Sequence, residues 1–236
     1  FLANVSRQSA QDLDEDQWID MPSYHRVALR PRLFYESDEG TTALLTMGVM
    51  NEDRQGGTVP NGLTPNGKSF PQDLKTRRLD AGIKLSHPIN DAISLEVRAS
   101  SMRQNHDHVF GDRLETDRHE TQLLEVSVVR NSNRATWVGG LAYQDDHYRA
   151  DVLPSFDYHY KVPALFGQFD YDLSNDITIA ASTRWDDHSQ FGSELSPRIS
   201  LLYRPGDWTI RGSLGQGFYT PTPFVEETEA TGLFAL

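Results

Sequence analysis

The densest group of side chains able to hold a ligand lies between Pro154 and Lys161. This short stretch combines aromatic rings with cations, at Phe156, Tyr158, His159, Tyr160 and Lys161. Aromatic faces attract cations, and cationic groups pair with anions through charge-assisted hydrogen bonds. The group can therefore bind a ligand without covalent chemistry. The same composition suits a belt of aromatic residues at a membrane interface, and the sequence leaves both interpretations open.

Four arginines form a second set of candidates, because alternation along their segments places them on the more polar side: Arg98, Arg184, Arg198 and Arg211. If the segments are strands of a barrel, that side is the interior, where the arginines could contact a ligand or a plugging domain. Charged linings are also usual in large barrels, so a purely structural role is the alternative.

Two groups resemble metal ligands without completing a site. Asp12–Asp16 places alternate carboxylates as calcium loops do, but Gln17 and Ser23 stand where such a loop has its glycine and its last glutamate. His106 and His108 share a strand face, yet the sequence fixes no third ligand beside them. We predict a solvated acidic loop and polar surface residues, with no metal site and no cofactor.

Composition excludes several classes of protein. Lys and Arg total 22 against 34 Asp and Glu, a net charge of −12, which disfavours nucleic-acid binding through phosphate neutralisation. Cysteine is absent, which removes disulfides, thiolate metal sites and cysteine nucleophiles. The sequence has no apolar run of the roughly 18 residues that a transmembrane helix needs. If the chain crosses a membrane, it must do so as a closed barrel.

The elements that must position these residues are strands. Apolar and polar residues alternate along one segment after another; for example Leu95 and Val97 oppose Glu96 and Arg98. The pattern predicts about ten or eleven strands of roughly 10–14 residues, longer than the average soluble strand of about 5–6. Such lengths suit a tilted barrel wall, which needs about 9–11 residues per crossing.

Short turns rich in Asn, Asp, Gly and Ser alternate with longer connections. The longer ones are predicted at residues 11–24, 54–75, 105–119, 145–163 and 188–195 and after Tyr219, with Leu233–Leu236 also in a loop. Outer-membrane barrels show this asymmetry, with tight periplasmic turns and long extracellular loops. We therefore predict an all-β fold, a long antiparallel up-and-down meander. A soluble β-sandwich also alternates and is the alternative fold.

The last two hairpins carry motifs of a known family. The strand SPRISLLYRP (residues 196–205), followed by a short turn and a strand ending in GQGFYTP (215–221), resembles the barrel of TonB-dependent outer-membrane receptors. The preceding pair, FGQFDY (166–171) and TRWDDH (183–188), is similar to the hairpin before it in that family. Residues 14–57 resemble an earlier part of the same barrel with less specific motifs.

The resemblance implies a barrel of about 22 strands plugged by an N-terminal domain. It also implies that the protein is a receptor of the bacterial outer membrane and not an enzyme. Such a receptor imports a scarce nutrient, most often a ferric siderophore, with energy from the TonB complex. Residues 1–236 would then be a partial barrel that lacks the plug and the later strands. The implied partners are outer-membrane lipid, lipopolysaccharide, the TonB complex through the plug, and a small-molecule chelate. In such receptors, rings and cations like those of Phe156–Lys161 hold flat anionic chelates.

Two other functions remain open at this stage. One is that of a complete barrel of roughly ten strands, either a porin or a surface protease using a pair such as Asp186 and His188. The other is that of a soluble β-sandwich that binds a partner.

Overall fold

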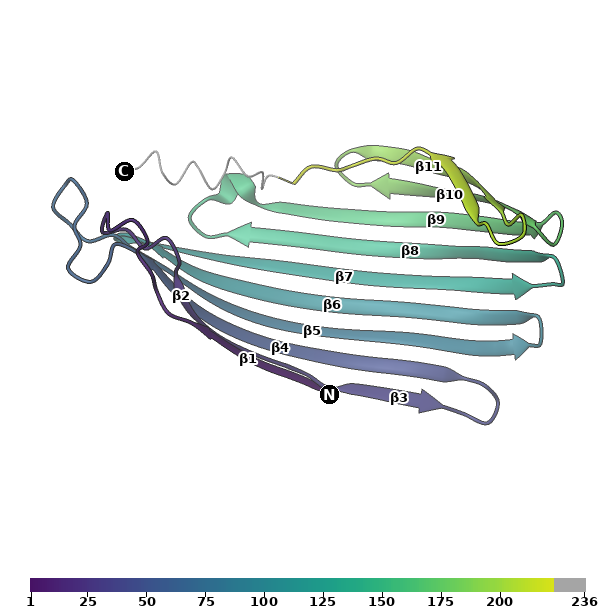
Figure 1. Ribbon diagram of the computed structural model, residues 1–236, viewed down its shortest axis with the longest axis horizontal. Coiled ribbons are helices and arrows are strands. Elements are labelled where there is room, and N and C mark those ends of the chain that lie inside the picture. The colour runs from purple at the N-terminus through teal and green to yellow at the C-terminus, as the bar shows by residue number, and fades with distance from the viewer. Residues whose placement is uncertain (223–236) are drawn as a thin grey trace.

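The computed structural model describes residues 1–222, which form one antiparallel sheet (Figure 1). Its strands are β1 (Leu2–Gln8), β2 (Ser23–Arg30), β3 (Arg32–Glu36), β4 (Thr42–Gly57), β5 (Pro71–Asn90), β6 (Ile93–Phe110), β7 (Arg113–Asn131), β8 (Ala135–Ala150), β9 (Tyr158–Asp172), β10 (Ile177–His188), β11 (Gly192–Tyr203) and β12 (Ile210–Gly215). A short 3-10 helix, η1 (Pro154–Phe156), lies in the connection between β8 and β9. Within residues 1–222, no helix has the length and apolar character needed to cross a membrane.

The strands follow one another across the sheet in chain order. Strands β2 and β3 both pair with β4, on either side of Pro31, so the twelve described strands occupy eleven positions. Proline lacks the N–H that a continuous ladder would need, which explains the break. The antiparallel meander predicted from the sequence, with ten or eleven positions, is confirmed.

The register separates the two faces of the sheet by chemistry. One row of directly paired residues crosses seven strands and is apolar throughout: Leu85, Val97, Val126, Leu141, Leu165, Trp185 and Leu195. The neighbouring row, one residue along each strand, points to the other face and is largely charged or small: Lys84, Arg98, Glu125, Ala142, Ala164, Asp186 and Glu194.

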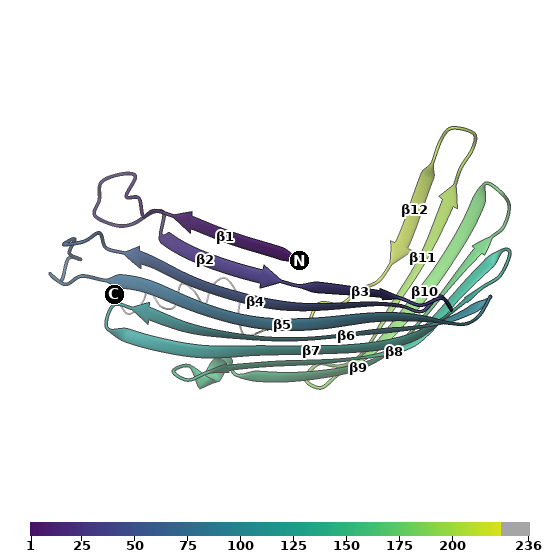
Figure 2. The same cartoon turned by 90° about the horizontal axis from the view of Figure 1, so that it is seen from below.

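The polar face is the concave one. The sheet curves into a trough (Figure 2), and side chains converge on the inner side of such a curve. Ala142, Ala164 and Asp186 are only 6%, 5% and 4% exposed, although no second sheet is described, whereas Leu141 on the opposite face is 63% exposed. An apolar convex face with a polar lining is the arrangement of a membrane barrel wall. The soluble β-sandwich considered from the sequence is wrong for the described residues, because apolar residues there face outward.

The outward-facing apolar residues form a band, which we call the apolar band. Its edge on the side of the longer connections runs through Val49, Leu79, Ala99, Leu124, Tyr143, Pro163 and Trp185. Strands β1 and β12 are the two edges of the described sheet, which is open. The complete closed barrel of ten strands is therefore not what residues 1–222 form.

The first predicted long connection is confirmed, because residues 9–22 separate β1 from β2, but the next four are shorter than expected. Residues 105–119 were expected to be a loop, but β6 and β7 meet in a two-residue turn at Gly111 and Asp112; likewise only residues 58–70, 151–157 and 189–191 separate the strands of three other hairpins. Beyond the apolar band both faces are polar, so alternation disappears while the backbone ladder continues. The predicted loop at Leu233–Leu236 lies outside the described residues.

Close packing between neighbouring strands on the concave face makes one glycine necessary. A Cβ on Gly140 would lie 2.6 Å from the carbonyl oxygen of Val126 and 2.6 Å from the ring of Phe166, whereas a Cβ on Gly139 would meet nothing within 4 Å. We expect Gly140→Ala to destabilise the folded protein by about 1 kcal/mol or more, because the backbone oxygen must move. Gly139→Ala is the matched control and should change stability by less than about 0.5 kcal/mol. Urea unfolding of both variants measures the difference, and equal midpoints would contradict this account.

Candidate ligand-binding site

A continuous group of aromatic side chains crosses the concave face beyond the apolar band. We call it the aromatic arc; it comprises His119 of β7, Tyr148 of β8, Tyr158 and Tyr160 of β9, His188 of β10 and Phe191 in the turn that follows. The register brings His119 beside Tyr148 and Tyr148 beside Tyr158. Alternation then adds Tyr160 on the same face of β9.

The rings of the aromatic arc are in mutual contact. Tyr158 stacks on Tyr148 with 5.8 Å between ring centroids, and on Tyr160 with 4.6 Å. His188 lies 4.8 Å from Tyr160 and 4.9 Å from Phe191. Stacked rings that hold one another in place form a rigid surface, on which a second planar group can pack at little entropic cost.

Carboxylates border the arc and fix its polar atoms. The Nε2 atom of His119 lies 2.7 Å from Asp146 and 3.3 Å from the hydroxyl of Tyr158. Burial and then the charge of Asp117 raise the pKa of Tyr148. Burial and then the charge of Asp146 raise the pKa of Tyr158. Both phenols, which lie beyond the apolar band, therefore stay protonated, and each donates its proton to the neighbouring carboxylate, Tyr148 to Asp117 and Tyr158 to Asp146.

A hollow of about 350 Å³ adjoins the arc at β9 and β10. Tyr160, Arg184 and His188 line it, together with residues after β12: Gly217, Phe218, Thr220 and Thr222. Asp186 accepts a hydrogen bond from Nε of Arg184 at 2.9 Å, while Nδ1 of His188 accepts one from the backbone N–H of Gln190 at 3.1 Å. Within residues 1–222 no hydrogen bond or ion pair joins Asp186 to His188, the pair considered from the sequence for a surface protease, and a catalytic role for that pair stays a prediction.

The comparisons with known proteins agree with this geometry. The family model described as TonB dependent receptor-like, beta-barrel, matches residues 12–228, which include every strand from β2 to β12. The chain belongs to the TonB-dependent receptor family. Members of this family are transport receptors of the outer membrane, not enzymes. A search among curated proteins found no match.

Solved structures of such receptors share the fold of this receptor barrel. The siderophore receptor PirA from Acinetobacter baumannii matches with a TM-score of 0.70 and 12% identity, over 93% of this chain and 38% of that chain. The siderophore receptor PiuA from Acinetobacter baumannii matches with 0.65 and 11%, over 89% and 44%. The copper transporter OprC matches with 0.66 and 11%, over 90% and 39%. The chain thus spans less than half the length of these receptors, and at such identities the likeness concerns the fold alone.

The receptor barrel divides the aromatic stretch predicted from the sequence between its two faces. Phe156 lies in η1, but residues 158–161 belong to β9 and not to a loop, which corrects our expectation. Tyr158 and Tyr160 face the concave side, whereas His159 pairs with His147, and Lys161 with Asp145, on the convex side. The stretch looked like a loop because polar residues occupy both faces here. Ligand binding by these residues stays a prediction.

The four arginines all lie on the concave face, as alternation predicted, but they do not form one group. Arg98 lies 3.5 Å from Glu125, and Arg184 pairs with Asp186. Arg198 donates to Ser213 at 3.1 Å, and Arg211 pairs across the ladder with Leu202. Arg98 on β6 and Asp186 on β10 share a row four strands apart, roughly 19 Å at the usual strand spacing. Arg98 therefore lies apart from the others, whereas Arg184 and Arg198 are diagonal neighbours on β10 and β11, because Arg184 pairs with Ser196 and Arg198 with Ser182.

Sequence reasoning missed part of the aromatic arc and its carboxylates. His119 and Tyr148, like Asp117 and Asp146, fell within segments expected to be loops. The signal available in the sequence was a spacing of two residues, which places side chains on the same face of a strand. Asp117 and His119 have this spacing, as do Asp146 and Tyr148. That spacing becomes informative only once both segments are known to be strands.

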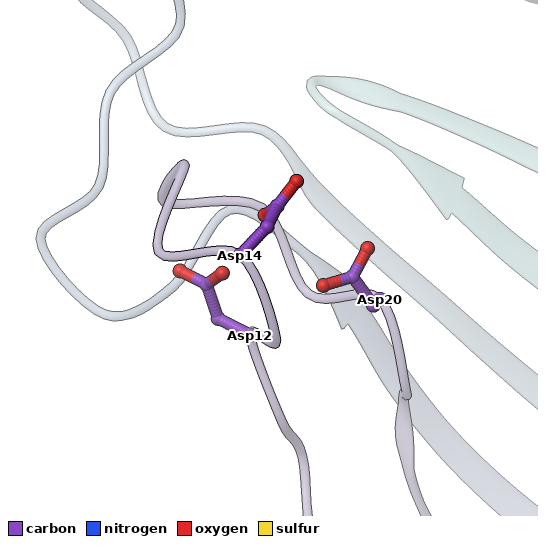
Figure 3. Close-up of side chains that lie close together, drawn as sticks. All are labelled: Asp12, Asp14 and Asp20. Atoms are coloured by element: carbon purple, nitrogen blue, oxygen red, sulfur yellow. The ribbon is translucent and has the colours of Figure 1, made fainter.

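The acidic loop before β2 brings three carboxylates together (Figure 3). The ligand atoms of Asp12, Asp14 and Asp20 all lie within 4.8 Å of one another. Backbone N–H groups of Gln17 and Leu13 donate to Asp12 and Asp20 at 3.0 and 2.7 Å. Desolvation, followed by repulsion from neighbouring carboxylates, raises the pKa of Asp14. The loop thus gathers acidic groups more closely than its spacing indicated, and our prediction of no metal remains a prediction.

Proposed function

We propose that this chain is part of the barrel wall of a longer outer-membrane receptor that takes up a ferric siderophore with energy from the TonB complex. In the complete protein, a plug domain would contact TonB, and the apolar band would contact outer-membrane lipid and lipopolysaccharide. Membership of the TonB-dependent receptor family and the siderophore receptors among its structural neighbours support this proposal.

The aromatic arc is the observation that carries the proposal. Its rings offer a flat apolar surface with protonated phenols, at the outer end of the polar face where an incoming ligand would first meet the wall. We propose Tyr158 and Tyr160 as ligand contacts, with Arg184 at the edge of the adjoining hollow. The other predicted ligand residues do not belong to the aromatic arc, so any contact they make with a ligand would lie elsewhere on the barrel wall: Phe156, His159, Lys161, Arg98, Arg198 and Arg211.

The charge at the arc restricts the ligand. Asp146 lies beside His119 and Asp117 beside His106, while Lys161 points to the opposite face. Carboxylates disfavour an anion placed next to them. The arrangement therefore favours a siderophore whose contacting part is neutral or cationic over the flat anionic chelate first expected.

Uptake of radioactive iron by bacteria tests the function. The complete reading frame, expressed in a strain lacking its own receptors, should confer uptake from a panel of ferric siderophores of different charge, with neutral or cationic members preferred. Deleting the TonB complex should abolish that uptake. Uptake that continues without the TonB complex would contradict TonB-energised transport. Absence of uptake with every siderophore in the panel would contradict a ferric siderophore as the ligand.

A further inference from the structure

His188, at the end of β10, is a buried imidazole beside the hollow that adjoins the aromatic arc. It is 5% exposed, and its ring centroid lies 4.8 Å from that of Tyr160 and 4.9 Å from that of Phe191. Rings packed on two sides of a buried side chain restrict its rotation. The two nitrogens of His188 therefore have fixed surroundings.

One of these nitrogens is used by the turn between β10 and β11. The backbone N–H of Gln190 donates to Nδ1 of His188 at 3.1 Å, and that of Phe191 donates to the same atom at 3.3 Å. A backbone N–H can only donate, so Nδ1 must offer its lone pair. The single hydrogen of a neutral imidazole therefore lies on the other nitrogen, Nε2.

The imidazole stays neutral in this position. His188 lies three residues beyond the edge of the apolar band at Trp185, about 10 Å along the strand. Burial lowers the pKa of His188, although the charge of Asp186 acts in the opposite direction. The two backbone donors also disfavour a second proton, because a hydrogen on Nδ1 would meet both of them. The Nε2–H group is thus an uncharged hydrogen-bond donor.

This donor has no acceptor within residues 1–222. The hydrogen bonds that His188 makes there all end on Nδ1. Buried polar groups in native proteins nearly always have a hydrogen-bond partner. Because His188 lines the hollow of about 350 Å³, a ligand in that hollow can supply the acceptor.

The chain after β12 also contributes to this hollow. Strand β12 pairs with β11 as far as Gly215, and the N–H of Gln216 still donates to the carbonyl oxygen of Pro197. Within the described residues the pairing ends there, and Phe218 lines the same hollow as His188. A group bound beside His188 would therefore meet residues of the strands and of this segment together.

The charges around the hollow select the kind of acceptor. Asp146 and Asp186 line it, and Glu194 of β11 pairs directly with Asp186 on the same face. Arg184 is the one cation among its described lining residues, and its Nε–H donates to both oxygens of Asp186, at 2.9 and 3.1 Å. An anionic group beside His188 would face more carboxylates than cations, whereas an uncharged oxygen meets no such repulsion.

We propose that His188 is a specificity-determining residue of the ligand site, whose Nε2–H donates a hydrogen bond to an uncharged oxygen of the ligand, such as a carbonyl oxygen. The rings of Tyr160 and Phe218 would pack against the apolar atoms around that oxygen. The inference rests on the proposed function and names the chemical group that is recognised in this hollow.

Substitutions at this one position separate ligand binding from support of the turn. The side-chain amide of His188→Gln can place an N–H near the position of Nε2, whereas the amide oxygen of His188→Asn can replace Nδ1 as the acceptor for the turn. His188→Leu provides neither group. We expect His188→Gln to keep binding within about threefold, and both His188→Asn and His188→Leu to weaken it about tenfold, the factor for one lost hydrogen bond.

Iron uptake by cells that express the complete reading frame measures these effects. The probe is an uncharged ferric trihydroxamate that carries radioactive iron and whose carbonyl oxygens accept hydrogen bonds. His188→Asn and His188→Leu should raise its half-saturating concentration about tenfold and leave the maximal rate within about twofold. His25→Leu, on the convex face of β2 opposite Asp53, is the matched control and should change neither value. Heat-modifiable gel mobility confirms that each variant folds.

Four outcomes decide between a ligand donor and other roles. Normal uptake by His188→Asn together with weak uptake by His188→Gln would show that His188 only supports the turn, which would overturn the inference. An unchanged half-saturating concentration in His188→Leu would overturn it as well. Uptake of an anionic ferric siderophore in place of the trihydroxamate would overturn the inference and leave uptake of a ferric siderophore standing. Absence of uptake with every siderophore would refute the proposed function itself.

Discussion

Tyr158→Ala is expected to weaken siderophore binding by about 30-fold, equivalent to about 2 kcal/mol, because central aromatic residues carry much of the energy of a binding surface. Tyr158 is the centre of the aromatic arc: it stacks on Tyr148 and Tyr160, and its hydroxyl lies 3.3 Å from Nε2 of His119. Removing its ring takes away a contact surface and loosens the rings on both sides. Isothermal titration of the purified receptor with a neutral or cationic ferric siderophore measures the effect.

The same strand supplies the controls for this experiment. His159→Ala and Lys161→Ala change residues that belong to the same predicted ligand group but face the convex side. Each should leave the dissociation constant within about twofold, since neither lies on the arc. Tyr158→Phe separates the ring from the hydroxyl and should retain most of the affinity if stacking dominates. Normal binding by Tyr158→Ala together with weak binding by Lys161→Ala would move the site to the outer surface.

Within the apolar band, the sequence correctly predicted which face of a strand each side chain occupies. Between Leu95 and Ala99, for instance, only one side of β6 carries apolar side chains, so the pattern alternates and Arg98 could be assigned to the concave face. A period of two is visible only when the two faces differ in polarity. The resemblance of residues 195–221 to TonB-dependent receptors then indicated the family, which is confirmed over residues 12–228.

The outer ends of the strands were not predictable in this way. Between Asn105 and His119 both faces carry polar residues, so a continuous hairpin and a polar loop have the same pattern. Pairing between neighbouring strands decides the structure there, as the contact between His119 and Tyr148 shows. The residue pattern of a single segment does not reveal which residues pair across strands. The acidic loop is similar: Asp20 joins Asp12 and Asp14 because the chain returns to pair β2 with β1, a closure that local spacing does not encode.

The proposed contact between the convex face and membrane lipid predicts a measurable effect at Leu141. This residue is 63% exposed in the middle of the apolar row, between Val126 and Leu165. Leu141→Arg should destabilise the folded protein in a bilayer by about 1–2 kcal/mol. Leu141 lies two residues inside the edge of the apolar band at Tyr143, and the cost of an outward-facing arginine falls from about 2–4 kcal/mol at the midplane to about 0–1 kcal/mol near the interface. Urea titration of the protein folded into lipid vesicles, with heat-modifiable gel mobility as the readout, measures this loss.

A control on the same strand isolates the effect of lipid from the effect of charge. Gln144 lies three residues further along β8, on the concave face and exposed. Gln144→Arg should change stability by less than about 0.5 kcal/mol, because a solvated surface tolerates such a replacement. If the convex face met water instead, Leu141→Arg would be equally harmless. The difference between two arginines three residues apart therefore decides which face of the sheet the hydrocarbon covers.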